Sequence, residues 1–376
     1  MMVPTTNTLV LITGVTGHIG FKTLLFALNS GFTVRAAVRS NSKAQNILNH
    51  PKIQSLAPGP RLTFITVPDL TAPHAYDAAV EGVTHIIHIA SPLRISSGTD
   101  DEIPLNEQDA YFIQPAIRGT TSMLDAAHAS QTVRRIVITS SLTALIPFDA
   151  LVGDAPLPAE PITPASRVEL TEGPYLNEFE AYAASKVAAL AHAEEWLASH
   201  PSRQFDCIHL HPGFVQGRNE LATSAREVFG GTNKLVLGMV LGKTFEAPIA
   251  GATVHVDDVA RIHVQALSPF VPGDMGYILS QATEWDDAKT FVSKHFGGAV
   301  EKRVVPNTGH IETTRVNVDN GLTEDVFGRL AGFEEQVKSV VGHYVELRMK
   351  GMARRKRESK RPAAQQEAVR HAIATV

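Results

Sequence analysis

The sequence predicts an α/β fold in which a doubly wound parallel sheet is followed by a smaller C-terminal lobe. Two observations carry this prediction. Short apolar runs alternate with helical patterns through the first 215 residues, and the pattern then becomes less regular to about residue 348. Alternating strands and helices are typical of a parallel sheet with helices on both faces and right-handed crossovers. A ligand of such a sheet binds at the carboxyl ends of its strands.

Six strands and four helices account for the first part of the chain. The strands are short apolar runs, and the helices show apolar residues three or four positions apart. The first helix is closed by Gly31, a residue that favours helix ends. We expect strands at Thr8–Thr13, Thr33–Val38, Leu62–Val67, Thr84–Ala90, Arg135–Ser140 and Phe205–Leu210. We expect helices at Gly17–Ser30, Ala75–Glu81, Gln108–Ser130 and Asn177–His200.

Composition excludes several classes of protein. The chain has 376 residues, of which 44% are hydrophobic and 19% charged, so it is not largely disordered. No apolar run is long enough to span a membrane, and the N-terminus lacks the pattern of a signal peptide. The single cysteine, Cys207, forms no internal disulfide and suits a reducing compartment. We therefore expect a cytoplasmic protein without a membrane span.

The net charge of −4 conceals an uneven distribution. Residues 1–68 contain six basic residues and no Asp or Glu, residues 350–376 carry a net charge of +6, and residues 69–349 carry −16. A basic tail such as Lys350–Arg361 could bind nucleic acid or an acidic membrane surface. A solvated, disordered extension over residues 349–376 is the favoured interpretation, so no nucleic-acid partner is expected.

A glycine pattern follows the first strand and opens the first helix. Residues Thr13–Gly20 read TGVTGHIG. Gly14 allows a sharp turn, Gly17 allows the backbone to approach a pyrophosphate, and Gly20 allows the helix to pack on the strand. The strand–turn–helix context favours a Rossmann-type dinucleotide site over a purely structural turn.

The residues after the second strand predict which dinucleotide binds. A site that prefers NAD places an acid there to bind the ribose 2′-hydroxyl. This chain has Arg39 there, and Lys43 follows. A guanidinium grips a phosphate bidentately, whereas a carboxylate would repel it, so the prediction is NADP(H). The alternative is that Arg39 is a solvated surface charge. Asp69, the first acid of the chain, either accepts from the adenine amino group or only forms a turn.

A tyrosine and a lysine lie on one face of the long expected helix. Tyr182 and Lys186 are four residues apart. A nearby ammonium is expected to lower the pKa of the Tyr182 phenol, which can then exchange a proton with an alkoxide. A serine at the end of the fifth strand could polarise a carbonyl oxygen. Strand alternation lets only one of Ser140 and Ser141 face the site; we favour Ser141, but the pattern alone does not decide.

These motifs, in this order, resemble an extended short-chain dehydrogenase/reductase of the NAD-dependent epimerase/dehydratase superfamily. Within it the chain is most similar to dihydroflavonol-4-reductase-like aldehyde and ketone reductases, including the fungal methylglyoxal type. One departure is Gly217–Arg218, where many members have Gly-Pro. The matching stretches are TGVTGHIG (13–20), VRAAVRS (34–40), PDL (68–70), HIASPL (88–93), PAIRGTTSMLDAA (115–127), ITSSLTA (138–144), YAASK (182–186), HPGFVQGR (211–218), VHVDDVARIH (254–263) and FEEQVKSVVGHYVEL (333–347).

The resemblance implies a set of site residues. Ser141, Tyr182 and Lys186 would be the catalytic residues, and Tyr182 and Lys186 would also touch the cofactor. The other NADP(H) contacts would come from Gly14, Thr16, Gly17, His18, Ile19, Arg39, Lys43, Asp69, Leu70, Ala90, Ser91, Pro212 and Val215. No metal is expected: His209 and His211 share a strand face, but no carboxylate or Cys completes a ligand spacing with them.

The resulting hypothesis is an NADPH-dependent reductase of a small-molecule carbonyl compound, acting as a monomer or homodimer. Residues 1–215 would form the NADP-binding Rossmann domain, 254–275 would return to it, and 216–348 would form mainly a substrate-binding lobe. An apolar aldehyde or ketone is expected from candidate wall residues Leu93, Leu145, Phe148, Tyr175 and Phe214. The alternatives are an epimerase, a dehydratase or a 3β-hydroxysteroid-type dehydrogenase on the same fold, or a non-catalytic NADP-sensing regulator.

Overall fold

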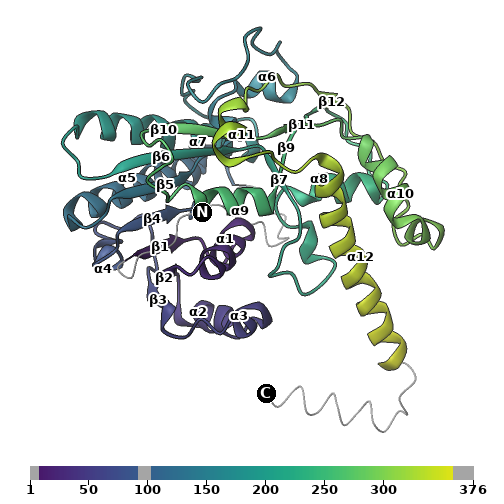
Figure 1. Cartoon of the computed structure of the whole chain (residues 1–376). Coiled ribbons are helices and arrows are strands. Elements are labelled where there is room, and N and C mark those ends of the chain that lie inside the picture. The colour runs from purple at the N-terminus through teal and green to yellow at the C-terminus, as the bar shows by residue number, and fades with distance from the viewer. Residues whose placement is uncertain (1–7, 92–102, 359–376) are drawn as a thin grey trace.

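A parallel sheet of seven strands forms the centre of the molecule (Figure 1). The structure is a computed structural model that describes residues 8–91 and 103–358. The spatial order of the strands is β10-β6-β5-β4-β1-β2-β3, and every neighbouring pair runs parallel. The predicted doubly wound α/β fold is confirmed. The strands are β1 (Leu9–Thr13), β2 (Thr33–Val38), β3 (Leu62–Thr66), β4 (His85–His88), β5 (Arg135–Thr139), β6 (Asp206–Pro212) and β10 (Met275–Leu279).

Helices cover both faces of this sheet because successive strand residues point to opposite sides. Val10 and Ile12 pack with the helices of one face, whereas Leu11 and Ile86 pack with those of the other, and all four are fully buried. The first face carries α1 (His18–Asn29), α2 (Asn41–Leu48), α3 (Pro51–Leu56) and α9 (Val256–Gln265). The second carries α4 (Asp77–Val80), α5 (Gln114–Ser130, preceded by a π-helical turn at Asp109–Ile113) and α7 (Glu178–Ser199).

The long helix α7 begins where its sequence provides a cap. The side chain of Asn177 accepts hydrogen bonds from the backbone N–H groups of Phe179 and Glu180, both at 3.0 Å. Acids at positions 178 and 180 complement the positive end of the helix dipole. This start fixes the positions of Tyr182 and Lys186, which lie in the second and third turns.

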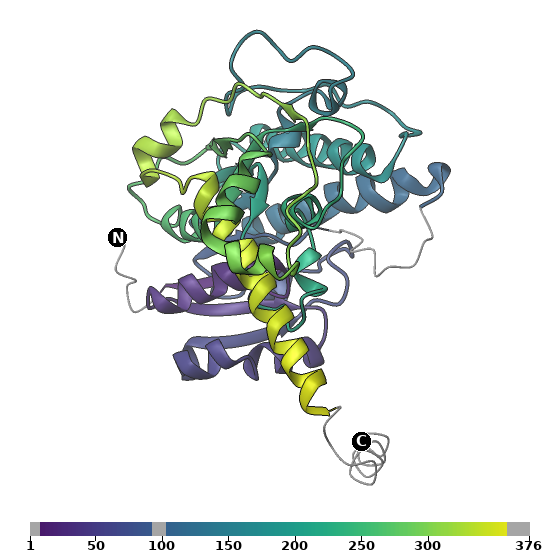
Figure 2. The ribbon, with the colours of Figure 1, turned by 90° about the vertical axis from the view of Figure 1, so that its right-hand side faces the viewer.

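A smaller lobe is built on the C-terminal side of the sheet, and it faces the viewer in Figure 2. Its own apolar core contains the fully buried Trp285, Val292 and Val337, and the ring of Phe333 packs edge-to-face on Trp285 at 5.7 Å. The lobe contains two small sheets, of order β11-β9-β7 and β12-β8. Its elements are β7 (Phe214–Gln216), α8 (Asn233–Val240), β8 (Ile249–Ala250), β9 (Ala252–His255), β11 (Gln281–Ala282), α10 (Asp287–Glu301), β12 (Thr313–Thr314) and α12 (Phe333–Glu358), and α6 (Phe148–Val152) and α11 (Gly321–Phe327) lie nearby.

Several features differ from the sequence-based expectation: α2 and α3 were not predicted, and two further differences lie at the edge of the sheet and at the end of the last helix. A seventh strand, β10, extends the sheet beyond β6, although residues 275–279 follow the irregular part of the pattern. The last helix, α12, continues to Glu358, whereas we expected the fold to end at 348 and a disordered tail to start at 349 (Figures 1 and 2). Residues 349–358 are rich in Lys, Arg and Met, which favour helix. The rest of the expected tail, 359–376, lies outside the described residues.

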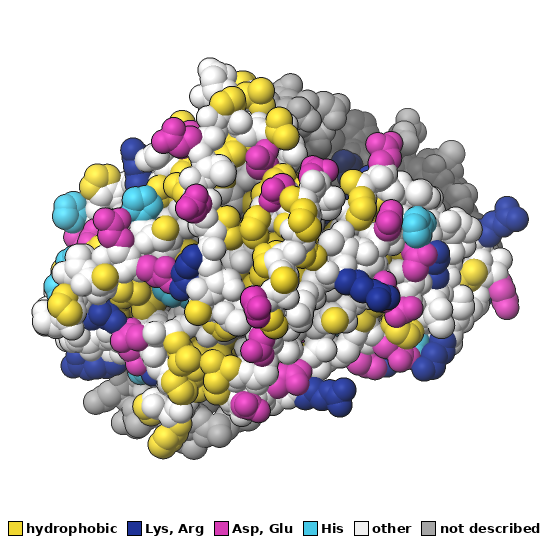
Figure 3. Space-filling view, turned by 90° about the horizontal axis from the view of Figure 1, so that it is seen from above, with side chains coloured by type: hydrophobic (Ala, Val, Ile, Leu, Met, Phe, Trp, Pro, Cys, Tyr) yellow, Lys and Arg dark blue, Asp and Glu magenta, His cyan; other side chains and the backbone are white. Residues whose placement is uncertain are grey.

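The surface reflects the predicted charge distribution. Acidic side chains are spread across the face on which α6 lies (Figure 3), in keeping with the net charge of −16 for residues 69–349. Among residues 8–91 and 103–358, no helix is long and apolar enough to cross a membrane.

Candidate active site

The turn between β1 and α1 is shaped by its glycines. Gly14 has a φ of +75°, and a Cβ there would lie 2.9 Å from the backbone nitrogen of Ala90. A Cβ on Gly20 would lie 2.1 Å from the carbonyl oxygen of Gly14, so only glycine lets the helix approach the turn. Gly17 is the N-cap of α1, and no side chain caps the first turn, which also contains no acid. The helix start therefore offers free backbone N–H groups to an anion.

A buried hydrogen-bond network ties this turn to the end of β4. The hydroxyl of Thr13 accepts the backbone N–H groups of Ile89 and Ala90, both at 3.0 Å. Its own proton is then left for Nδ1 of His88, at 3.1 Å. Burial lowers the pKa of His88 to about 4, which keeps this acceptor neutral. Sequence reasoning missed both side chains, although polar residues at the ends of two buried strands were a usable signal.

The predicted cofactor contacts that follow β2 are basic. Arg39 and Lys43 are exposed at the start of α2, whose first turn contains no acid and has no side-chain cap. Among the residues that the structure describes, neither forms a salt bridge. Asp69 is also exposed, and its Oδ1 accepts from the backbone N–H and the hydroxyl of Thr71, at 2.8 and 2.7 Å. These bonds lower the pKa of Asp69 and form the turn that was the alternative interpretation.

The remaining predicted cofactor contacts occupy different environments. Thr16 is exposed at the tip of the turn, and Ile19 is half-buried against the core. Leu70 reaches α5, since a Cβ on Gly119 would come within 2.6 Å of its Cδ1. Pro212 ends β6, and Val215 is buried in β7.

His18 contacts the lobe. Its Nε2 lies 3.3 Å from the carbonyl oxygen of Arg218, and burial lowers its pKa to about 4. Arg218 occupies the position at which many family members have proline. Its guanidinium pairs with Glu220 at 3.3 Å and with Glu346 of α12 at 2.8 Å. Arg218 therefore connects His18, in the nucleotide-binding half, to the last helix α12.

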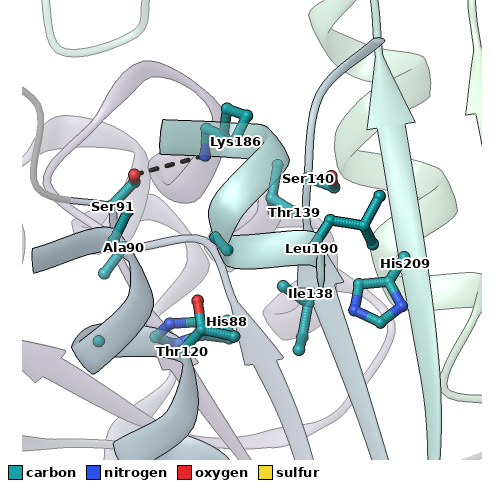
Figure 4. Close-up of a pocket in the computed structure, with 13 residues that line it drawn as sticks. His88, Ala90, Ser91, Thr120, Ile138, Thr139, Ser140, Lys186, Leu190 and His209 are labelled. Atoms are coloured by element: carbon teal, nitrogen blue, oxygen red, sulfur yellow. Dashed lines mark hydrogen bonds between the residues drawn. The ribbon is translucent and has the colours of Figure 1, made fainter. Parts of the chain in front are cut away.

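The predicted catalytic side chains meet at the carboxyl end of β5. The hydroxyl of Ser141 hydrogen-bonds to that of Tyr182. The ammonium of Lys186 lies 5.7 Å from the centre of the Tyr182 ring and donates to the hydroxyl of Ser91 at 3.3 Å (Figure 4). Residues far apart in the chain thus form one cluster beside the glycine turn.

The structure distinguishes between the two serines. Ser141 faces Tyr182, and its Oγ accepts from the backbone N–H and hydroxyl of Thr143, at 3.2 and 2.9 Å. Because both lone pairs of this oxygen are used, its own proton is left to donate to Tyr182. Ser140 lines a cavity of about 20 Å³ beneath Lys186 instead (Figure 4). Thr143 was not predicted as a site residue.

Burial sets the protonation of the cluster. It raises the pKa of the Tyr182 phenol, and the hydrogen bond from Ser141 offsets only part of this rise. Burial also lowers the pKa of Lys186 to about 8. The expectation of a lowered pKa for Tyr182 is therefore wrong for this structure, because desolvation outweighs the effect of the ammonium that lies over the ring. The phenol is protonated at neutral pH and is ready to donate.

The candidate wall residues divide into two groups. Leu145 and Tyr175 are buried in apolar clusters, and Phe214 packs 6.0 Å from Trp285. Phe148 is half-buried and forms an edge-to-face pair with Phe179 at 5.5 Å. Leu93 lies outside the described residues.

An apolar rim was missed by sequence reasoning. Phe179 is 38% exposed and Leu176 is 85% exposed, and both lie at the start of α7, shortly before Tyr182. Large exposed apolar side chains beside a polar cluster are typical of a binding mouth.

Comparison with known proteins gives three findings. The model of a family described as "NAD dependent epimerase/dehydratase family" matches residues 10–277. Ketoreductase CTB6 of Cercospora beticola is 38% identical over 91% of this chain and 96% of its own, and the NAD-dependent epimerase/dehydratase ALT6 of Alternaria alternata is 34% identical over 88% and 96%. The crystal structure of yeast methylglyoxal/isovaleraldehyde reductase Gre2, complexed with NADPH, superimposes with a TM-score of 0.73 at 21% identity over 90% of this chain and 98% of that one, which shows the same fold.

Proposed function

The chain belongs to the NAD-dependent epimerase/dehydratase family, and we propose that it is an NADPH-dependent reductase that converts the carbonyl group of an apolar ketone or aldehyde to an alcohol. One observation carries the proposal: Ser141, Tyr182 and Lys186 cluster at the carboxyl end of β5, beside the glycine turn. The relative named a ketoreductase supports a carbonyl compound as the substrate class.

The residues present fit NADPH. The uncapped start of α1 would hold the pyrophosphate, and neither Gly14 nor Gly17 presents a side chain that would keep it away from the backbone. Arg39 and Lys43, at the uncapped start of α2, would hold a 2′-phosphate, and no acid in the first turn of that helix opposes it. When bound, the cofactor supplies a hydride to the carbonyl carbon.

The protein's own groups would handle the oxygen and the proton. Thr143 donates to Ser141, which donates to Tyr182, so the proton of the Tyr182 phenol is free to move to the substrate oxygen. The raised pKa of Tyr182 keeps that proton available, as carbonyl reduction requires. The nearby ammonium of Lys186 would then stabilise the phenolate that remains.

The substrate would enter past the apolar rim of Leu176 and Phe179, where Phe179 pairs with the half-buried Phe148. Because apolar surface buried on binding contributes about 25 cal/mol per Å², we expect longer alkyl or aryl ketones to be better substrates than acetone.

A panel of ketones and aldehydes, monitored by NADPH oxidation at a fixed cofactor concentration, tests the proposal. We expect turnover with apolar members and at least a tenfold higher kcat/KM with NADPH than with NADH. Turnover of nucleotide sugars without net cofactor oxidation would favour an epimerase or dehydratase instead.

A further inference from the structure

The ammonium of Lys186 is buried in surroundings that hold no acid. Lys186 is 8% exposed, and it lines a cavity of about 20 Å³ at the carboxyl ends of β4 and β5 (Figure 4). Among the described residues, no Asp or Glu lines this cavity. Because a buried charge is costly unless it is paired or hydrogen-bonded, groups other than a carboxylate have to stabilise the ammonium.

The other titratable groups around Lys186 carry no charge that could serve this purpose. His88, at the end of β4, and His209, on β6, line the same cavity, and burial lowers the pKa of each to about 4, so both rings are neutral. On α7 itself, burial raises the pKa of Tyr182, so the phenol that lies beside the ammonium is neutral as well. The residues that α5 and the end of β5 add to the wall have no titratable side chain.

The hydroxyl of Ser91 supplies a hydrogen bond to this buried charge. The ammonium of Lys186 donates to it at 3.3 Å, and among the described residues this is the hydrogen bond that the ammonium makes (Figure 4). A hydrogen bond from a charged donor is stronger than one between neutral groups. It favours the charged form of the lysine, since the neutral amine is the weaker donor. Ser91 therefore opposes the loss of the Lys186 proton.

The glycine turn holds the segment that carries Ser91 in place. The hydroxyl of Thr13 accepts the backbone N–H groups of Ile89 and Ala90, both at 3.0 Å, and the backbone nitrogen of Ala90 also lies close to Gly14. Ser91 follows these residues directly, and its short side chain leaves only one χ angle to fix. The network that shapes the predicted pyrophosphate turn thus also fixes the backbone from which Ser91 reaches the ammonium.

We propose that Ser91 is a positioning residue, whose hydroxyl fixes the ammonium of Lys186 beside Tyr182 and stabilises its positive charge. This role rests on the proposed function, in which that ammonium stabilises the phenolate left after proton transfer. It differs from the cofactor contact that the family resemblance implies for Ser91, because a serine that only binds cofactor would not change the titration of Lys186 in the free protein.

Titration of Lys186 in the full-length protein without cofactor tests this role independently of turnover. In protein labelled with ¹³C-lysine, the Cε signal of Lys186 follows the loss of its proton, and its absence from Lys186→Arg identifies it. The wild-type midpoint should lie near pH 8, since burial lowers the pKa of Lys186 to about 8. Ser91→Ala should lower this midpoint by about one pH unit, a tenfold change in the ratio of ammonium to amine, and Ser91→Thr, which keeps the hydroxyl, should restore it.

Ser140→Ala is the matched control. Ser140 lines the same cavity, but its hydroxyl has no hydrogen-bond partner among the described residues. Its removal should therefore leave the midpoint of Lys186 where it is in the wild type. A midpoint that is the same in Ser91→Ala as in the wild type, or that shifts equally in Ser140→Ala, would overturn the proposal.

The pH dependence of reduction gives a second readout. The kcat/KM for NADPH reports the free protein, so its fall at high pH should move with the midpoint, and the loss of kcat/KM in Ser91→Ala should be about fivefold larger at pH 8 than at pH 6. A loss of equal size at every pH would contradict the proposed role. If no carbonyl compound is reduced while Ser91→Ala still shifts the titration of Lys186, the proposed function fails and the contact between Ser91 and Lys186 stands.

Discussion

The carboxyl edge of the sheet and helix α10 of the lobe differ in how tightly their glycines are packed and in which side chains are buried nearby. At the carboxyl edge of the sheet, Gly14 and Gly20 have no room for a methyl group, and the titratable side chains of His88 and Tyr182 are buried in hydrogen-bond contact with hydroxyl groups. In the lobe, a Cβ added to Gly298 of α10 would meet no atom within 4 Å, and the core around Trp285 is apolar. The difference teaches that the buried polar and titratable groups of the candidate site gather at the sheet edge, whereas the core around Trp285 in the lobe serves packing.

The largest effect should come from the phenol. Tyr182→Phe removes the proton donor but keeps the ring that Lys186 faces, so turnover should fall by about 10²–10⁴-fold. The affinity for NADPH, measured by fluorescence titration, should stay within about twofold because the glycine turn is untouched. A variant that retains most of the wild-type kcat would remove Tyr182 from the mechanism.

The second-largest effect should be on the preference for NADPH over NADH. Arg39→Asp places a carboxylate where we expect the 2′-phosphate, and kcat/KM with NADPH should fall at least tenfold while that with NADH changes little. Lys338→Asp is a control, since this half-buried lysine of α12 is not a predicted cofactor contact and its ammonium pairs with Glu335 at 2.9 Å. Equal losses with both cofactors would indicate that Arg39 is structural.

The pH dependence of reduction follows from Lys186. Its pKa of about 8 means that the ammonium is present below pH 8 and lost above it, while the raised pKa keeps Tyr182 protonated across this range. The kcat for reduction should therefore be flat below about pH 7 and fall as the pH rises through 8. In Lys186→Arg, whose guanidinium stays charged, any activity that remains should not show this fall; a rate that rises through pH 8 in the wild type would contradict the assignment.

The smallest effects should be on the free energy of unfolding, and they should have opposite signs in the two regions. Gly20→Ala brings a methyl group within 2.1 Å of the Gly14 carbonyl oxygen and should destabilise the fold by about 1–3 kcal/mol. Gly298→Ala has open space in a helix and should stabilise by about 0.5–1 kcal/mol. Urea unfolding of both variants measures the contrast, and an equal cost at both positions would contradict it.

Much of the sheet was predictable because its signals are local. The strand at Thr33–Val38 was predicted with its observed bounds, and α7 was predicted to within a residue at each end, since Asn177 caps it and its side chains favour helix. β10 was not predicted, because an edge strand of five residues is decided by tertiary contacts. The continuation of α12 was not predicted, because the basic composition of this segment favoured a solvated extension over the helix that its residues also allow.

The positions of the candidate site residues could be predicted from the sequence, but their pKa shifts could not. The spacing of Tyr182 and Lys186 placed both on one helix face, and the structure brings Ser141 to them. The raised pKa of Tyr182 depends on burial by segments far apart in the chain, and the donor role of Thr143 depends on the local fold after β5. The spacing of residues in the sequence predicts neither the pKa of Tyr182 nor the hydrogen bond from Thr143.

The most direct test of the proposed chemistry follows the hydride. The protein is incubated with an apolar ketone and NADPH that carries deuterium at the transferable C4 position, and the alcohol product is analysed by mass spectrometry and NMR. We predict one deuterium per product molecule, at the carbinol carbon, with one equivalent of NADPH oxidised. An alcohol without deuterium, or no alcohol from any ketone or aldehyde tested, would contradict the account.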